Sequence, residues 1–154
     1  MGKWYFLACS LCLLYLFWEA SCRGQPVSIG FVNTKIAGLS LQSKSNRGMP
    51  SWHVSTYFRK DEYLQVNGDI QYFFTPDALK LGNFFTSTYS GIGIRVASFA
   101  YQDEEKYWLR IPAGLQWEAK PLHMQLFFEI AGLAGPFPNT AVSFNSSLGV
   151  RVLL

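Results

Sequence analysis

The sequence is poor in charge, and beyond residue 22 it has no cysteine. Only 15% of its 154 residues are charged, against about 25% in a typical soluble domain. This shortage indicates that much of the protein's exterior does not face water. Because Cys9, Cys12 and Cys22 all lie near the N-terminus, removal of that segment would leave a chain without thiols or disulfides.

Other absences exclude whole classes of function. Lys and Arg form no cluster or stripe, and the formal net charge is only +3, so the sequence lacks the basic footprint of a nucleic-acid-binding protein. No group of Cys, His and carboxylate residues has metal-ligand spacing, and no Gly-rich loop precedes a helix. We therefore expect no metal, no cofactor and no nucleic-acid partner.

The N-terminal segment has the pattern of an export signal. Lys3 supplies a positive start, the uncharged apolar run Trp4 to Trp18 follows, and small residues lead up to Gly24. We predict a signal peptide over residues 1–24 and one exported domain over residues 25–154.

Two other interpretations of this segment stay open. The first is a membrane-anchoring helix, although the apolar run is shorter than the roughly 20 residues that a span needs. The second is acylation of Cys22 as in a lipoprotein. Against it, Glu19 stands where such processing sites usually carry an aliphatic residue.

After residue 25 the sequence is dominated by alternation of apolar and polar residues, with turn residues between the runs. One short helical turn is predicted over Asp77–Phe84, because Pro76 and Asp77 form a plausible helix start. The remainder predicts an all-β domain of eight strands: Val27–Asn33, Ile36–Ser43, Trp52–Arg59, Tyr63–Phe74, Tyr89–Ala100, Tyr107–Trp117, Leu122–Gly132 and Val142–Leu153.

These strands separate an apolar face from a polar face. In Leu122–Gly132, for example, Leu126 and Phe128 alternate with Gln125 and Glu129. A soluble barrel would need apolar residues inside and charges outside, whereas strands of about ten residues with one uncharged face and aromatic ends are typical of a transmembrane β-barrel. Every ionisable residue within a strand lies on the polar, inward face: Arg59, Asp69, Arg95, Arg110, Glu129, Arg151, His53 and His123.

Pairing of neighbouring strands predicts one charge cluster around Glu129. A turn over Glu118–Pro121 sets Arg110 directly opposite Glu129, and Arg151 comes from the strand on the other side of Glu129. We expect both arginines to share this carboxylate.

A second cluster is predicted around Asp69. A turn over Lys60–Glu62 sets His53 opposite Asp69, and Arg59 and Arg95 come from the two strands beside it. Because side chains just fill an eight-stranded barrel, we interpret both clusters as a structural polar core. A cationic lumen that binds an anion is the alternative, since the inward arginines outnumber the inward acids.

Segments of the C-terminal half resemble known strands. Tyr-Ser-Gly-Ile-Gly-Ile-Arg (residues 89–95) resembles the Gly-x-Gly strand of the small OmpA- and OmpX-like barrels of the outer-membrane β-barrel superfamily. Arg-Ile-Pro-Ala-Gly-Leu (110–115), Phe-Phe-Glu-Ile-Ala (127–131) and Leu-Gly-Val-Arg (148–151) continue the likeness.

The resemblance implies an eight-stranded up-and-down membrane barrel with Arg110, Glu129 and Arg151 as an internal charge cluster, and it implies no activity. One departure concerns the C-terminus. Such barrels usually end in an aromatic residue that the assembly machinery reads, whereas this chain ends Val152-Leu153-Leu154.

Some small outer-membrane barrels are lipid-modifying enzymes, which need a nucleophile and a base near the rim. Both histidines are predicted to point inward, with His123 facing Gln116 across a hairpin. His53 shares a face with Ser55, but one such spacing is weak evidence for catalysis. We predict no catalytic residue.

These features predict a small monomeric barrel, integral to a bacterial outer membrane, with a structural, surface or host-interaction role. Its expected partners are the membrane lipid, the barrel-assembly machinery and a surface or host ligand. A soluble lipocalin-like ligand-binding barrel and a lipid-modifying enzyme are the alternative functions.

Overall fold

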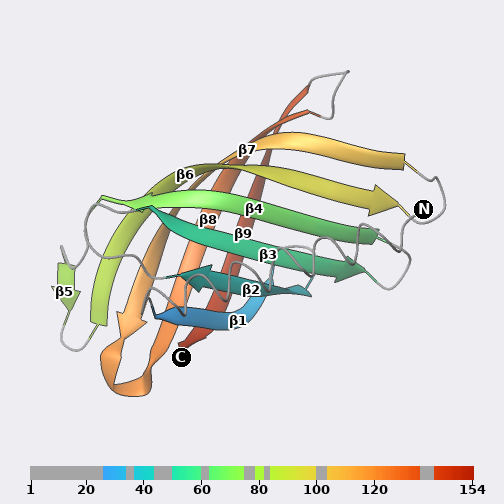
Figure 1. Ribbon diagram of the computed structural model, residues 1–154. Coiled ribbons are helices and arrows are strands. Elements are labelled where there is room, and N and C mark those ends of the chain that lie inside the picture. Colours follow the sequence, from blue (N-terminus) through green and yellow to red (C-terminus); the bar gives the residue numbers. More distant parts are fainter. Residues whose placement is uncertain are drawn as a thin grey trace.

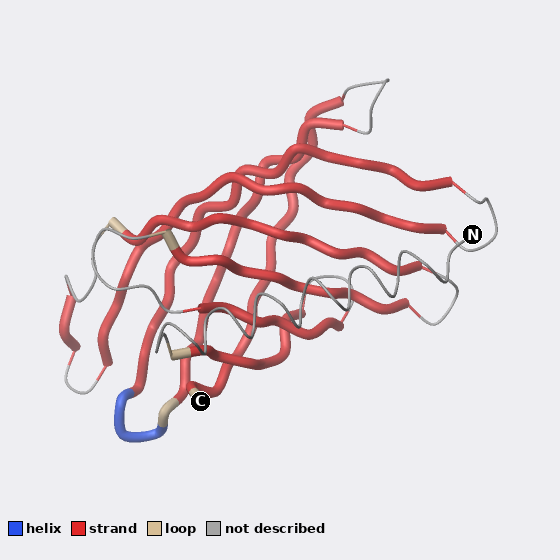
Figure 2. The backbone as a smooth tube through the Cα atoms, viewed as in Figure 1, coloured by secondary structure: helices blue, strands red, loops and turns tan. Residues whose placement is uncertain are grey.

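A computed structural model gives the chain the form of an antiparallel β-barrel (Figures 1 and 2). The structure describes residues 26–33, 37–43, 50–59, 63–74, 79–81, 84–99, 104–135 and 141–154, so the predicted signal peptide lies outside the described residues. Its elements are β1 (Val27–Asn33), β2 (Ala37–Ser43), β3 (Ser51–Arg59), β4 (Tyr63–Phe73), β5 (Leu79–Leu81), β6 (Phe84–Phe99), β7 (Glu104–Ala119), the 3-10 turn η1 (Lys120–Leu122), β8 (Met124–Gly135) and β9 (Ala141–Leu153).

Eight of these strands form a closed ring. Each strand pairs antiparallel with the next, β4 pairs directly with β6, and β1 pairs with β9 to close the barrel. The short β5 lies outside this ring, at the end of β6. The predicted eight-stranded antiparallel barrel is therefore confirmed.

The predicted helical turn over Asp77–Phe84 is wrong where the structure describes it. Leu79–Leu81 is extended and pairs with Phe84–Thr86 of β6. The prediction relied on Pro76 and Asp77 as a helix start, and both residues lie outside the described part of the chain. Pairing with a neighbouring strand overrides such a local signal, because it satisfies the backbone groups of this segment equally well.

The turn between β7 and β8 falls later than predicted. β7 continues through Glu118 and Ala119, so the partner of Arg110 is Leu133 and the partner of Glu129 is Gly114. His123 closes the turn with φ of 50° and is exposed, so its predicted inward position is also wrong. The register differs from the prediction by four residues, an even number, which leaves every facing along the two strands unchanged.

Apart from that of His123, the facings predicted for Leu109, Gln116, Gln125, Leu126 and Val150 agree with the structure. Along β8, buried residues alternate with exposed or half-buried ones from Met124 to Gly135. Leu109, Leu126 and Val150 are exposed, whereas Gln116 and Gln125 are buried. The polar face of the strands thus forms the interior of the barrel, and the apolar face forms the exterior.

Two glycines make room for aromatic rings inside the barrel. Phe127 of β8 pairs with Gly149 of β9, and Tyr89 of β6 pairs with Gly114 of β7. A Cβ at Gly149 would overlap the Phe127 ring, and a Cβ at Gly114 would overlap the Tyr89 ring. Each ring therefore lies over the glycine of the neighbouring strand, a device that pins strand register.

We predict that Gly149→Ala destabilises the barrel by about 1–3 kcal/mol, because the added methyl group must displace the Phe127 ring or the nearby carbonyl oxygen of Phe31. Gly68→Ala is the matched control, since a Cβ at Gly68 of β4 meets no atom within 4 Å. Urea titration in detergent measures both variants. Equal stability of the two would show that Phe127 does not rest on Gly149.

Candidate functional site

The interior of the barrel is predominantly polar. Among the described residues, the buried side chains include nineteen polar or charged residues and only ten apolar ones. Arg110, Arg151, His53 and Glu129 are among the largest side chains that are fully buried. Because buried polar groups are costly unless they are bonded, their contacts define what this interior can do.

The guanidinium of Arg110 joins the two predicted charge clusters. From β7, its Nη1 donates to Oδ2 of Asp69 on β4, and its Nη2 donates to Oε1 of Glu129 on β8. All three side chains are essentially buried. The sequence placed Arg110 beside Glu129 alone, and it did not predict the bond to Asp69.

A chain of contacts leads from Asp69 to Arg151. His53 Nδ1 lies 3.2 Å from Asp69 Oδ2, consistent with the register that pairs these two residues. His53 Nε2 lies 3.0 Å from the hydroxyl oxygen of Ser40, and Arg151 Nε donates to the same oxygen at 2.8 Å. These contacts connect β4, β3, β2 and β9.

A second chain returns from Arg151 to Glu129. Arg151 Nη1 donates to Gln42 Oε1 at 2.7 Å, and Gln42 Nε2 donates to Gln71 Oε1 at 2.8 Å. Gln71 Nε2 then donates to Glu129 Oε2 at 3.3 Å. The contacts form a closed circuit, here called the lumen ring, with eight members: Arg110, Asp69, His53, Ser40, Arg151, Gln42, Gln71 and Glu129.

The lumen ring ties together strands that are not neighbours. Its members come from β2, β3, β4, β7, β8 and β9, and Tyr89 of β6 adds a hydrogen bond from its hydroxyl to Glu129 Oε2 at 3.0 Å. Ser147 Oγ also donates to Glu129, at 3.4 Å. Glu129 therefore accepts from four side chains and is the most heavily bonded carboxylate of the ring.

Arg151 makes contacts other than those predicted. Its hydrogen bonds go to Ser40 and Gln42 instead of Glu129. Its guanidinium carbon lies 3.7 Å from the centre of the Phe127 ring, a cation–π arrangement that partly offsets the burial of its charge. Phe127 in turn belongs to a small apolar cluster with Val32 and Tyr57.

Of the other two predicted arginines, only Arg95 has a described side chain, and it is not a member of the lumen ring. Arg95 Nε donates to Asn67 Oδ1 at 3.0 Å, and Asn67 Nδ2 donates to Ser55 at 3.1 Å. The side chain of Arg59 lies outside the described part of the structure.

The sequence missed several members of this interior. Ser40, Gln42 and Gln71 carry no charge, so a search for ionisable residues passed over them, although their polar-face position was a usable signal. Glu118 is a further buried carboxylate. It was assigned to the turn because β7 was predicted to end at Trp117.

Three members of the lumen ring resemble a metal site. Ligand atoms of His53, Asp69 and Glu129 all lie within 4.8 Å of one another. The guanidinium of Arg110 bonds both carboxylates, however, so a cationic group already occupies the position between them. A metal ion would have to displace this buried arginine and leave its charge without a partner.

Three members also have the connectivity of a hydrolytic triad, in the order Ser40, His53, Asp69. A triad needs a nucleophile that substrate can reach. Ser40 is 0% exposed, and its hydroxyl oxygen already accepts a hydrogen bond from Arg151. Within the described residues, the arrangement therefore joins strands and presents no open nucleophile.

Comparison with solved structures gives one relevant likeness. The chain superposes on the N-terminal β-barrel domain of OprF from Pseudomonas aeruginosa with a TM-score of 0.51 and 11% sequence identity. The match covers 84% of this chain and 96% of the OprF domain. The two share the fold of an antiparallel β-barrel. At this identity the likeness establishes the fold and nothing about activity.

Sequence comparisons add no family. No protein-family model matches the chain, and no curated protein matches it. The described residues contain no helix that is both long enough and apolar enough to cross a membrane.

We predict that Glu129→Ala lowers the free energy of unfolding by about 3–5 kcal/mol, because four donors lose their acceptor and Arg110 keeps only one of its two carboxylates. Urea titration in detergent gives the value. Glu129→Gln is the control for side-chain size, because it retains one acceptor oxygen but replaces the other with a donor NH2 group and removes the charge. A loss below about 1 kcal/mol for Glu129→Ala, typical of exposed pairs, would contradict a closed interior.

Proposed function

We propose that this protein is a small integral barrel of a bacterial outer membrane, with a structural, surface or host-interaction role and no chemistry of its own. The proposal rests on the composition of the barrel's exterior. Among residues whose side chains are described, no exposed residue is Asp, Glu, Lys or Arg, and twenty-three large apolar side chains are exposed. A water-facing surface of this composition would be strongly unfavourable, whereas lipid matches it.

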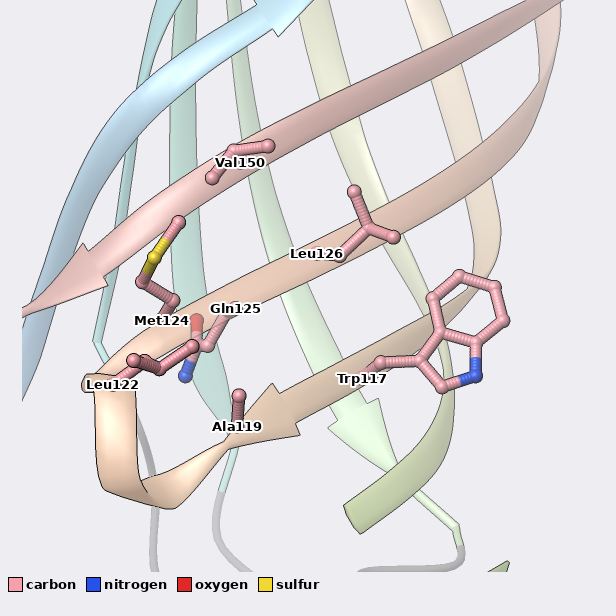
Figure 3. A pocket seen from close by; sticks show the side chains of 7 residues that line it. All are labelled: Trp117, Ala119, Leu122, Met124, Gln125, Leu126 and Val150. Carbon is pink, nitrogen blue, oxygen red and sulfur yellow. The ribbon is translucent and has the colours of Figure 1, made fainter. Parts of the chain in front are cut away.

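The region around β7, β8 and β9 illustrates this exterior. Trp117, Leu126 and Val150, from three neighbouring strands, line an outward groove of about 450 Å³ together with Leu122 and Met124 (Figure 3). Lipid acyl chains are apolar and flexible, so they fit an uneven surface of this kind. We infer that this part of the wall contacts the hydrocarbon layer.

The interior supports a structural role. An eight-stranded barrel leaves space for side chains and little else, and the lumen ring spans this space between opposite strands. A lipocalin-like barrel would instead need an apolar interior for its ligand and a charged exterior. Both requirements run against the observed distribution, which favours the membrane proposal over the soluble alternative.

In this proposal the N-terminal signal peptide directs export, and the assembly machinery inserts the barrel as a monomer. Its permanent contacts are with membrane lipid. A surface or host ligand would bind at the loops or strand ends, since the lumen-ring side chains bond one another across the interior.

The absence of hydrolytic chemistry can be tested at Ser40. We expect no labelling of the folded protein by a fluorophosphonate probe, because Ser40 is buried and hydrogen-bonded to Arg151. Mass spectrometry of the treated protein reads the result, with a serine hydrolase as positive control. Labelling that is lost in the Ser40→Ala variant would show that Ser40 is a reactive nucleophile, and it would contradict the proposal.

Facing toward lipid can be tested with two adjacent residues. We predict that Leu126→Arg impairs insertion into lipid vesicles far more than Gln125→Arg. A charge on the lipid-facing side costs about 2–4 kcal/mol at the midplane and less toward the interfaces, and Leu126 is the third residue of β8. Gln125 is inward and lies in register between Glu118 and Arg151, so the carboxylate of Glu118 can offset the repulsion between a new cation there and Arg151.

The shift in gel mobility between unheated and boiled samples measures folding yield in vesicles. Because the two residues are neighbours, strand propensity and distance from the turn are the same, and facing is the main difference. Equal yields, or a lower yield for Gln125→Arg, would reverse the assignment of inside and outside and favour the soluble alternative.

A further inference from the structure

An apolar groove lies on the outside of the barrel, beside the turn between β7 and β8. Trp117 of β7, Leu126 of β8 and Val150 of β9 are in register and form a row along it. Figure 3 shows Ala119 between Trp117 and Leu122. Because Ala119 ends at a methyl group, the wall is hollowed between the indole ring and the Leu122 side chain. The volume of about 450 Å³ falls within the roughly 300–1,000 Å³ of small-molecule sites.

The chemistry of the lining restricts what this groove can hold. No Asp, Glu, Lys or Arg is among the described residues that line it, and the side chain of Gln125 is buried and points into the barrel. The backbone of the wall is engaged as well, since β7 and β8 are paired on both sides here and Val150 of β9 pairs with both Leu126 and Phe31. A docked polypeptide would therefore leave its own N–H and C=O groups without partners. A hydrocarbon chain has no such groups.

Within the proposed membrane barrel, this groove starts at the boundary of the hydrocarbon layer. Trp117 is two residues before the end of β7, and aromatic residues at strand ends lie at the membrane–water interface of such barrels. The turn between β7 and β8 is short, and His123 within it is exposed. Short turns of these barrels are on the periplasmic side, where the outer membrane presents a leaflet of phospholipid. A lipid of that leaflet would have its headgroup at the turn and a chain along Trp117 and Leu126.

We propose that this groove binds one acyl chain of a phospholipid of the periplasmic leaflet, more tightly than the surrounding wall does. The proposal rests on the lipid-facing exterior of the proposed function. On the convex wall a chain contacts protein along one side only, whereas in the groove it also contacts Trp117 and Leu122 at its flanks. The gain comes from van der Waals contact, because neighbouring lipids are as apolar as the wall. The indole N–H of Trp117 is a donor for the ester oxygens at the head of the chain.

Fluorescence quenching by a phospholipid with brominated acyl chains tests the proposal, because bromine quenches tryptophan only at close contact. The full chain is used in detergent micelles, with four tryptophans replaced by phenylalanine so that Trp117 is the only one left: Trp4, Trp18, Trp52 and Trp108. The bromines are placed near the ester end of the chain, at the depth of the groove. The mole fraction of brominated phospholipid is increased stepwise, and the mole fraction that halves the fluorescence is measured.

A matched control has its only tryptophan outside the groove but at the same level of the barrel, through Trp117→Phe and Ile29→Trp. Ile29 of β1 is exposed and pairs with Val152, which in turn pairs with Met124 of the groove. We expect half-quenching of Trp117 at about a tenfold lower mole fraction than in the control. Such a difference corresponds to roughly ten further carbon–carbon contacts.

Two further variants, made in the chain with Trp117 alone, test the hollow itself. Ala119→Phe fills it and should raise the half-quenching mole fraction about tenfold, to the value of the control. Ala113→Phe adds the same side chain at an exposed position of β7 outside the groove and should leave the value unchanged. Gel mobility verifies folding. If Ala119→Phe does not fold, the comparison of Trp117 with Ile29→Trp decides alone.

Equal quenching curves for Trp117 and Ile29→Trp, or equal shifts by Ala119→Phe and Ala113→Phe, would overturn the proposal. A dimer that sediments in lipid-free detergent and that Ala119→Phe converts to a monomer would overturn it as well, and would assign the groove to a second copy. Failure of the lipid-facing proposal would give a different result, since neither tryptophan would then be quenched at any mole fraction.

Discussion

The guanidinium of Arg110, bound to both Asp69 and Glu129, is the interaction on which the interior depends. Without it two buried carboxylates would lie close together with no cation between them, an arrangement that a closed, dry interior does not tolerate. With it, the remaining polar side chains complete a circuit through six strands. The interior of this barrel is thus joined by a polar network rather than by an apolar core, and the large apolar side chains lie mostly on the exterior.

The same network contains two arrangements that resemble reactive sites. Ser40, His53 and Asp69 have the order of a hydrolytic triad, and His53, Asp69 and Glu129 have the spacing of a metal site. In each case a buried arginine bonds the group concerned. Arg151 donates a hydrogen bond to the Ser40 oxygen, and Arg110 lies between the carboxylates of Asp69 and Glu129. Both arrangements are therefore engaged by arginine side chains within the described interior.

Much of the fold followed from local pattern. Alternation of apolar and polar residues is a property of neighbouring positions in the sequence. The eight strands and their two faces were therefore predictable without knowing which strands pair. The absence of charge on one face indicated a membrane barrel for the same reason. The helical turn over Asp77–Phe84 failed because a start signal for a helix is weaker than pairing with an adjacent strand, which the sequence does not display.

The sequence by itself thus determined which residues face inward and which face outward, since facing depends only on alternation and survives an even change of register. The tertiary structure determined which side chains contact one another in the interior. The register of β7 and β8 depends on where the chain turns, at His123, and the bond from Arg110 to Asp69 depends on barrel closure across strands that are far apart in sequence.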